Sequence, residues 1–269
     1  MAPRSVLLYV KLLMASFVQI GIQFTYSAIF SLAGPLFSTQ FKMSSAGTNV
    51  IFMLVGPLIG FFVQPIFGAI GDRCTFVWGR RRIFLAVGAF IDVLGMGIIA
   101  ASTFIDKALV DESSSSFSAS IQSSSTVKDT FSNHLVGAFL ALFGLFVAFT
   151  GVNLMQGPSR AIVSDIFDAE NQQDANLMIN ACCGFASAAC YGISAGTVGN
   201  NNMFLIMFAI SSATVAVTVL PTCLFSKEKR FEPTDGKKLN ILSPFIDLFQ
   251  AIKMIRLDII FILLALMFG

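Results

Sequence analysis

Long apolar runs alternate with short polar segments along the chain, and the length of each run sets the predicted element. A helix needs about 20 apolar residues to cross a bilayer, because every backbone N–H and C=O must be paired within the segment. The pattern predicts six complete spans, at residues 12–37, 46–70, 84–104, 135–163, 176–197 and 203–225. Another apolar run opens at 259 and reaches 269 after 11 residues. We interpret it as the start of a seventh helix, within which the sequence stops.

The composition supports a chain that is solvated mainly by lipid. Of its 269 residues 55% are hydrophobic and 12% charged, and the mean hydropathy is +0.80. The predicted fold class is therefore an all-α integral membrane protein. A net charge of +2, one Trp and three Tyr indicate no nucleic-acid partner. The five Cys have no metal or disulfide spacing and are interpreted as small buried side chains, so no metal or cofactor is expected.

Lysine and arginine predict which connections are cytoplasmic, because short basic loops stay on that side. With the N-terminus inside, 14 of the 17 basic residues fall on the inner side, and Lys42, Lys107 and Lys128 fall outside. The chain then divides into a six-helix bundle (1–225), a basic cytoplasmic linker (226–258) and the start of a second bundle (259–269). The Ser-rich segment 105–133 is expected to be a flexible outer loop with no chemical role.

Charges and spaced glycines gather in the inner connection between the second and third spans. Glycine lets two helix ends approach closely, and an aspartate there can pair with an arginine or face a helix N-terminus across an interface. Such contacts, broken and remade as two bundles rock, would form a conformational latch. The alternative is that the arginines follow the charge bias and bind lipid phosphate. The candidate latch residues are Gly68, Gly71, Asp72, Arg73, Gly79, Arg80, Arg81 and Arg82.

This loop resembles the helix 2–3 signature of the major facilitator superfamily. More narrowly, VQPIFGAIGDRCTFVWGRRRIF (63–84) and LMQGPSRAIVSDI (154–166) resemble its sucrose transporter branch, of the glycoside/cation symporter type. The resemblance implies twelve helices in two bundles that rock about a central sugar site, this chain holding the N-terminal six and the start of helix seven. It also implies an acidic partner for the loop at the inner end of the fourth span, and Asp165 fits that position. Transport would need the missing C-terminal bundle or a second copy.

Polar side chains inside the predicted spans are the candidates for substrate binding, because they are costly to place in hydrocarbon. The fourth span carries Asn153, Gln156 and Arg160, and the first carries Gln23 and Ser27 on one face. By resemblance, Arg160 matches the arginine that sucrose transporters use at the substrate or coupling site, and Asn153 matches an asparagine of that branch. A snorkelling Arg160, and interhelical hydrogen bonds from Gln23 and Ser27, are the alternatives.

The coupling residue is the main departure from that branch. Plant sucrose symporters carry an aspartate eleven residues before this arginine, where this chain has Phe149. Asp92 is the only carboxylate deep in a predicted span, and a protonatable group there could take over proton coupling. A structural Asp92 paired between helices is the alternative. The single histidine, His134, is expected only at the outer interface.

These features predict a secondary active, proton-coupled transporter of sucrose or a related glycoside, which works by alternating access in the plasma or vacuolar membrane. Its expected partners are a sugar, a proton and the lipid bilayer. A facilitator for another small solute and a truncated, non-transporting fragment are the alternatives. An enzyme is not expected, because the sequence has no paired carboxylates and no HExxH, Ser/His/Asp or Walker pattern.

Overall fold

The structure is a computed structural model that describes residues 6–72, 74, 76, 78–120, 131–200, 202–225, 246 and 250, with the backbone alone at 72 and 111–120. Within these residues every regular element is helical, which confirms the predicted all-α fold. The predicted linker (226–258), apart from residues 246 and 250, and the predicted start of helix seven (259–269) lie outside the described residues.

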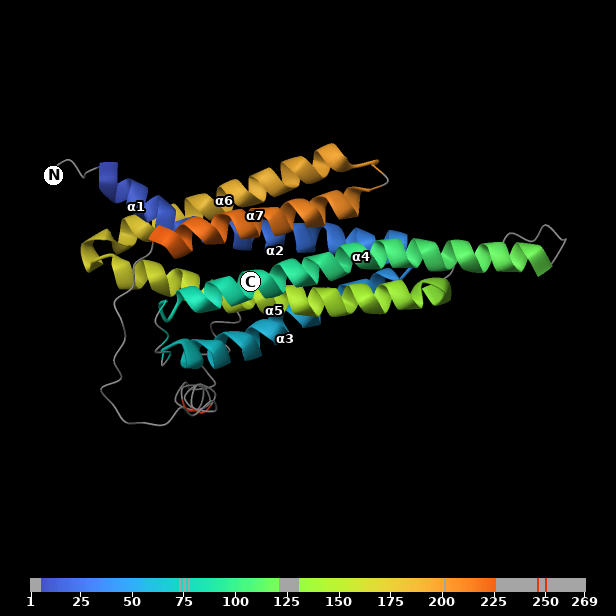
Figure 1. Cartoon of the computed structure of the whole chain (residues 1–269), viewed down its shortest axis with the longest axis horizontal. Helices are drawn as coiled ribbons and strands as arrows, with labels where there is room; N and C mark the ends of the chain where they lie inside the picture. Colours follow the sequence, from blue (N-terminus) through green and yellow to red (C-terminus); the bar gives the residue numbers. More distant parts are fainter. Residues whose placement is uncertain are drawn as a thin grey trace, which may run out of the picture.

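Six of the described segments are long and apolar enough to cross a membrane, as the hydrophobic pattern predicted. The chain is thus a multi-pass membrane protein. The helices run side by side along the long axis of the molecule (Figure 1). They are α1 (Val6–Ser16) and α2 (Val18–Pro35), which together form the first span, then α3 (Ser45–Asp72), α4 (Arg82–Ser120), α5 (Leu135–Ile166), α6 (Gln172–Thr197) and α7 (Met203–Phe225). A π-helix (Leu36–Gln40) and two 3-10 helices (Phe131–His134 and Ala169–Asn171) complete the described elements.

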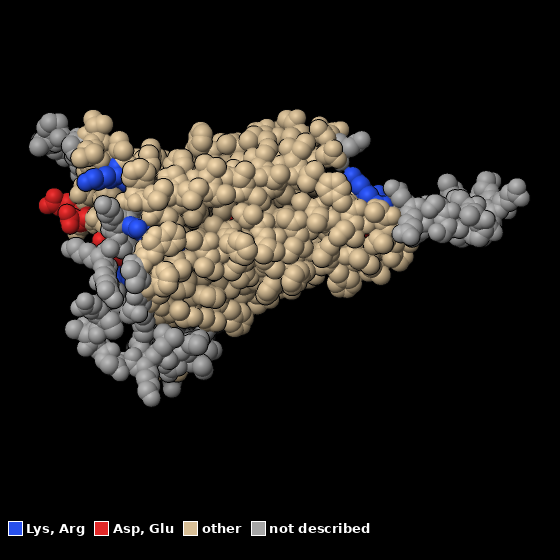
Figure 2. Space-filling view, viewed as in Figure 1, with Lys and Arg blue, Asp and Glu red and all other residues tan. Residues whose placement is uncertain are grey.

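The connections alternate between the two ends of the bundle. One end carries the turn between α3 and α4, the connection between α5 and α6, and the end of α7 (Figure 1). The opposite end carries the connections from α2 to α3 and from α6 to α7. On the face that Figure 2 shows, charged side chains lie at the two ends and the band between them is uncharged. This arrangement is typical of a bundle whose middle lies in hydrocarbon.

Helices α4 and α5 pack backbone against backbone because each presents glycines to the other. A Cβ atom on Gly88 would lie 2.9 Å from the carbonyl oxygen of Gly151, and one on Gly144 would lie 2.9 Å from the amide nitrogen of Ile99. Side chains cannot be accommodated at these distances. Small residues of this kind let membrane helices approach closely and gain dispersion contacts in a solvent that gives no hydrophobic drive between them.

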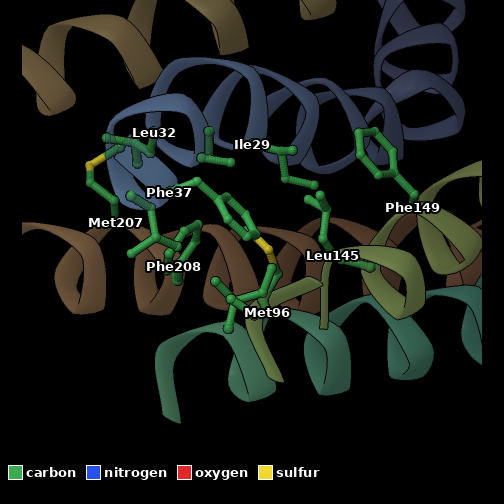
Figure 3. Packing of buried hydrophobic residues seen from close by; sticks show 14 of the residues in the cluster. Ile29, Leu32, Phe37, Met96, Leu145, Phe149, Met207 and Phe208 are labelled. Atoms are coloured by element: carbon green, nitrogen blue, oxygen red, sulfur yellow. The ribbon is translucent and has the colours of Figure 1, made fainter. Parts of the chain in front are cut away.

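An apolar core joins α2, the π-helix, α4, α5 and α7, whereas α3 and α6 are poorly covered. Only 6% of the most apolar stretch of α3 and 22% of that of α6 are buried, against 50% for α5. Helices α2, α4, α5 and α7 therefore form the packed part of the bundle, and α3 and α6 lie at opposite edges of it with most of their surface uncovered (Figure 1). Core residues labelled in Figure 3 are Ile29, Leu32, Phe37, Met96, Leu145, Phe149, Met207 and Phe208.

A break at Phe17 separates α1 from α2 within the first span. At this break the hydroxyl of Thr222, on α7, accepts a hydrogen bond from the Val18 amide at 3.1 Å and donates one to the Met14 carbonyl at 3.0 Å. Backbone groups freed by a helix break must find other partners in a membrane. Thr222 supplies them for both sides of the break.

The structure corrects the predicted start of the outer loop. Helix α4 continues to Ser120, well into the segment 105–133 that we predicted to be flexible. Asp106 lies on this extension, 2% exposed, and binds His134 at the start of α5. This pair holds α4 against the start of α5 beyond the predicted span, and α4 continues past the end of its apolar run.

Candidate functional site

Helix α5 places Asn153, Gln156 and Arg160 on one face, at spacings of three and four residues. Asn153 is buried, and its side-chain amide donates to the Phe149 carbonyl at 2.8 Å. This bond fixes the side chain and turns its carbonyl oxygen away from the α5 backbone. Gln156 is half-buried and Arg160 is exposed. The three candidates predicted on this span therefore share one face of α5.

Gln64 of α3 ties two of these residues together. Its Nε2 donates to Asn153 Oδ1 at 2.9 Å and to Gln156 Oε1 at 2.7 Å. The hydroxyl of Tyr26, on α2, donates to the same Asn153 oxygen at 3.2 Å. We call Tyr26, Gln64, Asn153 and Gln156 the amide cluster. The sequence pattern did not single out Gln64, although a glutamine within an apolar span is a signal that could have found it.

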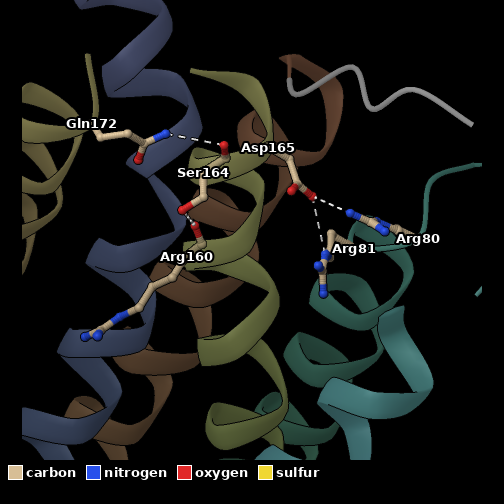
Figure 4. Close-up of polar contacts among 6 residues, drawn as sticks. All are labelled: Arg80, Arg81, Arg160, Ser164, Asp165 and Gln172. Carbon is tan, nitrogen blue, oxygen red and sulfur yellow. Dashed lines mark hydrogen bonds and ion pairs between the residues drawn. The ribbon is translucent and has the colours of Figure 1, made fainter. Parts of the chain in front are cut away.

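Arg160 lies one helical turn from Gln156 towards the end of the bundle that carries the α3–α4 turn. Figure 4 shows its side chain pointing away from Arg80, Arg81 and Asp165. No carboxylate of the described residues binds its guanidinium group. Five N–H donors in a planar fork are thus left at the edge of the amide cluster.

Gln23 and Ser27 contact a different residue. Gln23 Nε2 donates to the hydroxyl of Ser187, on α6, at 3.1 Å, and the hydroxyl of Ser27 donates to the same oxygen at 3.2 Å. These bonds join α2 to α6, as the interhelical alternative predicted. Ser187 stands in a run of small residues and was not singled out, since serine is common in such runs.

Asp92 is fully buried on α4. Its Oδ2 accepts a hydrogen bond from Thr25 of α2 at 3.2 Å, and the Thr25 hydroxyl also lies 2.9 Å from that of Ser211 on α7. The other Asp92 oxygen has no hydrogen-bond partner in the described part of the chain. The network joins α2, α4 and α7, whereas the amide cluster joins α2, α3 and α5.

At the end of the bundle beside the α3–α4 turn, Asp165 pairs with two arginines. Its Oδ2 lies 3.0 Å from Arg80 Nη2 and 3.5 Å from Arg81 Nε (Figure 4). Gly79 adopts φ 122°, a conformation that residues with a side chain rarely take, so glycine is needed where the turn enters this cluster. The structure thus brings Gly79, Arg80, Arg81 and Asp165 together.

Other predicted latch residues lie differently. A Cβ on Gly68 would meet no described atom within 4 Å, so the close helix approach expected there is not found inside this bundle, because Gly68 belongs to the poorly covered α3. A Cβ on Gly71 would meet Phe84 at 3.5 Å, an ordinary contact. Arg82 begins α4 and forms no ion pair with a described residue. The Asp72 side chain and all of Arg73 lie outside the described residues.

His134, which we expected only at the outer interface, is buried and paired at the start of α5. It is 6% exposed, and its Nδ1 lies 2.8 Å from Asp106 Oδ2. Gln40 donates to the same carboxylate oxygen at 3.4 Å. Chain folding brings Asp106 and His134 together across 28 positions, which no local pattern reveals.

The chain is similar in sequence to several sucrose transport proteins, although no family model matches it. It is 28% identical over 253 residues to sucrose transport protein SUT4 of Oryza sativa subsp. indica, which covers 88% of this chain and 40% of that protein. It is 28% identical over 258 residues to sucrose transport protein SUC3 of Arabidopsis thaliana (90% and 41%). It is 30% identical over 193 residues to sucrose transport protein SUT1 of Oryza sativa subsp. japonica (71% and 32%). The predicted resemblance to the sucrose transporter branch is confirmed, and the chain spans about two fifths of the length of the first two relatives.

Proposed function

We propose that this chain forms the six-helix N-terminal half of a secondary active sugar transporter, which moves sucrose or a related glycoside by alternating access. The observation that carries the proposal is the amide cluster with Arg160, in a chain similar to sucrose transport proteins. Amide side chains both donate and accept hydrogen bonds, as a hydroxyl-rich ligand requires.

We propose separate roles for the candidate residues, which their contacts support. Gln156 and Arg160 have polar atoms left for a ligand, and Asn153 orients Gln64 and Tyr26 around them. Gln23 and Ser27 hold α2 against α6 through Ser187 and so fix one wall of the site. In this proposal Gln156 and Arg160 contact the sugar, whereas Gln23 and Ser27 position the wall of the site.

The poorly covered surfaces of α3 and α6 are the ones that we propose a second bundle contacts. Alternating access requires two bodies that rock about a fixed site. The partner would be a C-terminal bundle or a second copy of this chain. In this scheme the N-terminus and the α3–α4 turn are cytoplasmic, and the protein resides in the plasma or vacuolar membrane. Arg80, Arg81 and Asp165 would act as the latch that breaks and re-forms during rocking.

Asp92 is the proposed site of proton coupling. It sits between α2, α4 and α7, with one oxygen bound to Thr25 and the other without a partner in the described residues. Loss or gain of a proton there would change the contacts among three helices at once. A facilitator without coupling is the second candidate, since buried Phe149 stands where plant symporters have their aspartate, with its ring tilted against Tyr26 and edge-on to Phe30.

Uptake of labelled sucrose and maltose into membrane vesicles, measured at two outside pH values, tests the proposal. We expect faster uptake at the lower outside pH, because an inward proton gradient drives symport. Arg160→Ala should abolish uptake, and Asp92→Asn should leave uptake that no longer depends on pH. Wild-type uptake without pH dependence would identify the facilitator. Sugar flux equal to that of vesicles lacking the protein would refute sugar transport.

A further inference from the structure

A cleft of about 500 Å³ lies between α1 and the ends of α5 and α7, outside the amide cluster. It is lined by the buried side chains of Ala15 and Phe167 and by the exposed side chains of Leu7, Val10 and Phe225. Its volume falls in the range of pockets that hold small-molecule ligands. The cleft is at the same end of the bundle as the α3–α4 turn (Figure 1), where the apolar band of the molecule gives way to charged side chains (Figure 2).

Lys11 of α1 is the one charged residue among the described residues that line this cleft, and the others are all apolar. Its side chain is exposed. Asp168 and Glu170, on the connection after α5, are also exposed but do not line the cleft. The sequence is basic next to both helices, with Arg4 two residues before α1 and SKEKR (226–230) directly after α7. An apolar cleft with a cation at its edge is complementary to a ligand that joins an apolar chain to an anionic group.

We propose that the cleft binds an anionic phospholipid, with one acyl chain against the apolar residues and the phosphate group on Lys11. An acyl chain fills the cleft because an empty space forfeits dispersion contacts, and water there finds few hydrogen-bond partners. Lipid tails surround the whole bundle, so the chain alone gives no selectivity. The ammonium group of Lys11 provides it, because basic residues at the membrane surface attract anionic headgroups.

Phosphatidylglycerol and phosphatidylcholine with identical dioleoyl chains are matched probes, because the first has a net negative charge and the second has none. Each lipid is titrated into the detergent-purified protein, and native mass spectrometry measures its Kd. The variants Lys11→Gln and Lys11→Arg test the charge, and Lys107→Gln removes another exposed cation, far along α4, as a control. Phe225→Ser tests the apolar wall. Leu224→Ser is its control, because both side chains are 68% exposed and only Phe225 lines the cleft.

We expect wild-type protein to bind phosphatidylglycerol about fivefold more tightly than phosphatidylcholine, the order of effect of one lysine at an anionic surface. Lys11→Gln should abolish this preference, whereas Lys11→Arg and Lys107→Gln should keep it. Phe225→Ser should weaken the binding of both lipids several-fold, and Leu224→Ser should not. A preference that survives in Lys11→Gln would overturn the inference. So would lipid binding that Phe225→Ser leaves unchanged, the result expected if the linker or a second bundle fills the cleft.

Discussion

Thr222 contacts both sides of the break at Phe17, so the first span depends on one hydroxyl of α7. Replacement by Val keeps the volume but leaves the Val18 amide and the Met14 carbonyl without this partner. We expect Thr222→Val to lower the free energy of unfolding by about 1–2 kcal/mol. Thr222→Ser should retain most of the wild-type free energy of unfolding, because serine keeps the hydroxyl. Unfolding in detergent measures the change.

Thr214→Val is the matched control on the same helix, because the Thr214 hydroxyl donates only to the Ile210 carbonyl within α7. Its effect should be within about 0.5 kcal/mol. Equal destabilisation by Thr214→Val and Thr222→Val would show that the bridge at the break is worth no more than a local bond.

At the scale of single residues, the sequence predicts a polar group better than its partner. Asn153, Gln156 and Arg160 stand out because each interrupts an apolar span. Their neighbour Gln64 sits on another helix 89 positions from Asn153, and only packing brings the two together. The same holds for Gln23 and Ser187, 164 positions apart. Hydropathy reports the cost of a polar group, whereas its hydrogen-bond partner depends on how the helices are arranged.

The packing of helix α4 against helix α5 depends on glycine. A Cβ on Gly95 would lie 2.7 Å from the Cα of Ala148, whereas one on Gly97 would meet no described atom within 4 Å. Gly95→Ala should therefore push α4 from α5 and cost about 1–3 kcal/mol. Gly97→Ala, two residues along the same helix, should be neutral. Unfolding in detergent compares them, and equal stabilities would contradict close backbone packing here.

The Arg80–Arg81–Asp165 cluster gives a prediction about movement rather than stability. Asp165 is 36% exposed, and partly exposed ion pairs contribute about 0–1 kcal/mol, so Asp165→Asn should barely change unfolding. It should instead free the α3–α4 turn and raise the labelling rate of nearby Cys74 by a thiol reagent several-fold. Mass spectrometry identifies the labelled cysteine. Asp168→Asn, three residues further along and just beyond the end of α5, is the control, and a rate unchanged in Asp165→Asn would argue against a latch.

Run length predicts the spans themselves, because a bilayer needs a fixed number of apolar residues. The boundaries and irregularities follow other rules. The break at Phe17 and the π-helix after Pro35 depend on backbone hydrogen bonding, to which hydropathy is insensitive. The extension of α4 to Ser120 passes through the polar segment that the pattern assigned to a loop.

On the face that Figure 2 shows, the charged side chains of the molecule lie at its two ends. Because connections alternate between the ends, Ser45 at the start of α3 and Cys74 beyond its end should lie on opposite sides of the membrane. A membrane-impermeant maleimide should label Ser45→Cys in intact cells and Cys74 only after permeabilisation. Labelling of Cys74 in intact cells would reverse the proposed orientation.

The bridge from Thr222 to the first span also has a consequence for biogenesis. Thr222 is 204 positions from Val18, so the ribosome must add nearly the whole bundle before the two can meet. At translation rates of about 5–20 residues per second, the wait is roughly 10–40 s. During that interval the Val18 amide and the Met14 carbonyl at the break have no Thr222 hydroxyl to bind, and lipid offers no hydrogen-bond partner in its place. The insertion machinery, or water at its mouth, would have to shelter residues 14–18 until α7 arrives.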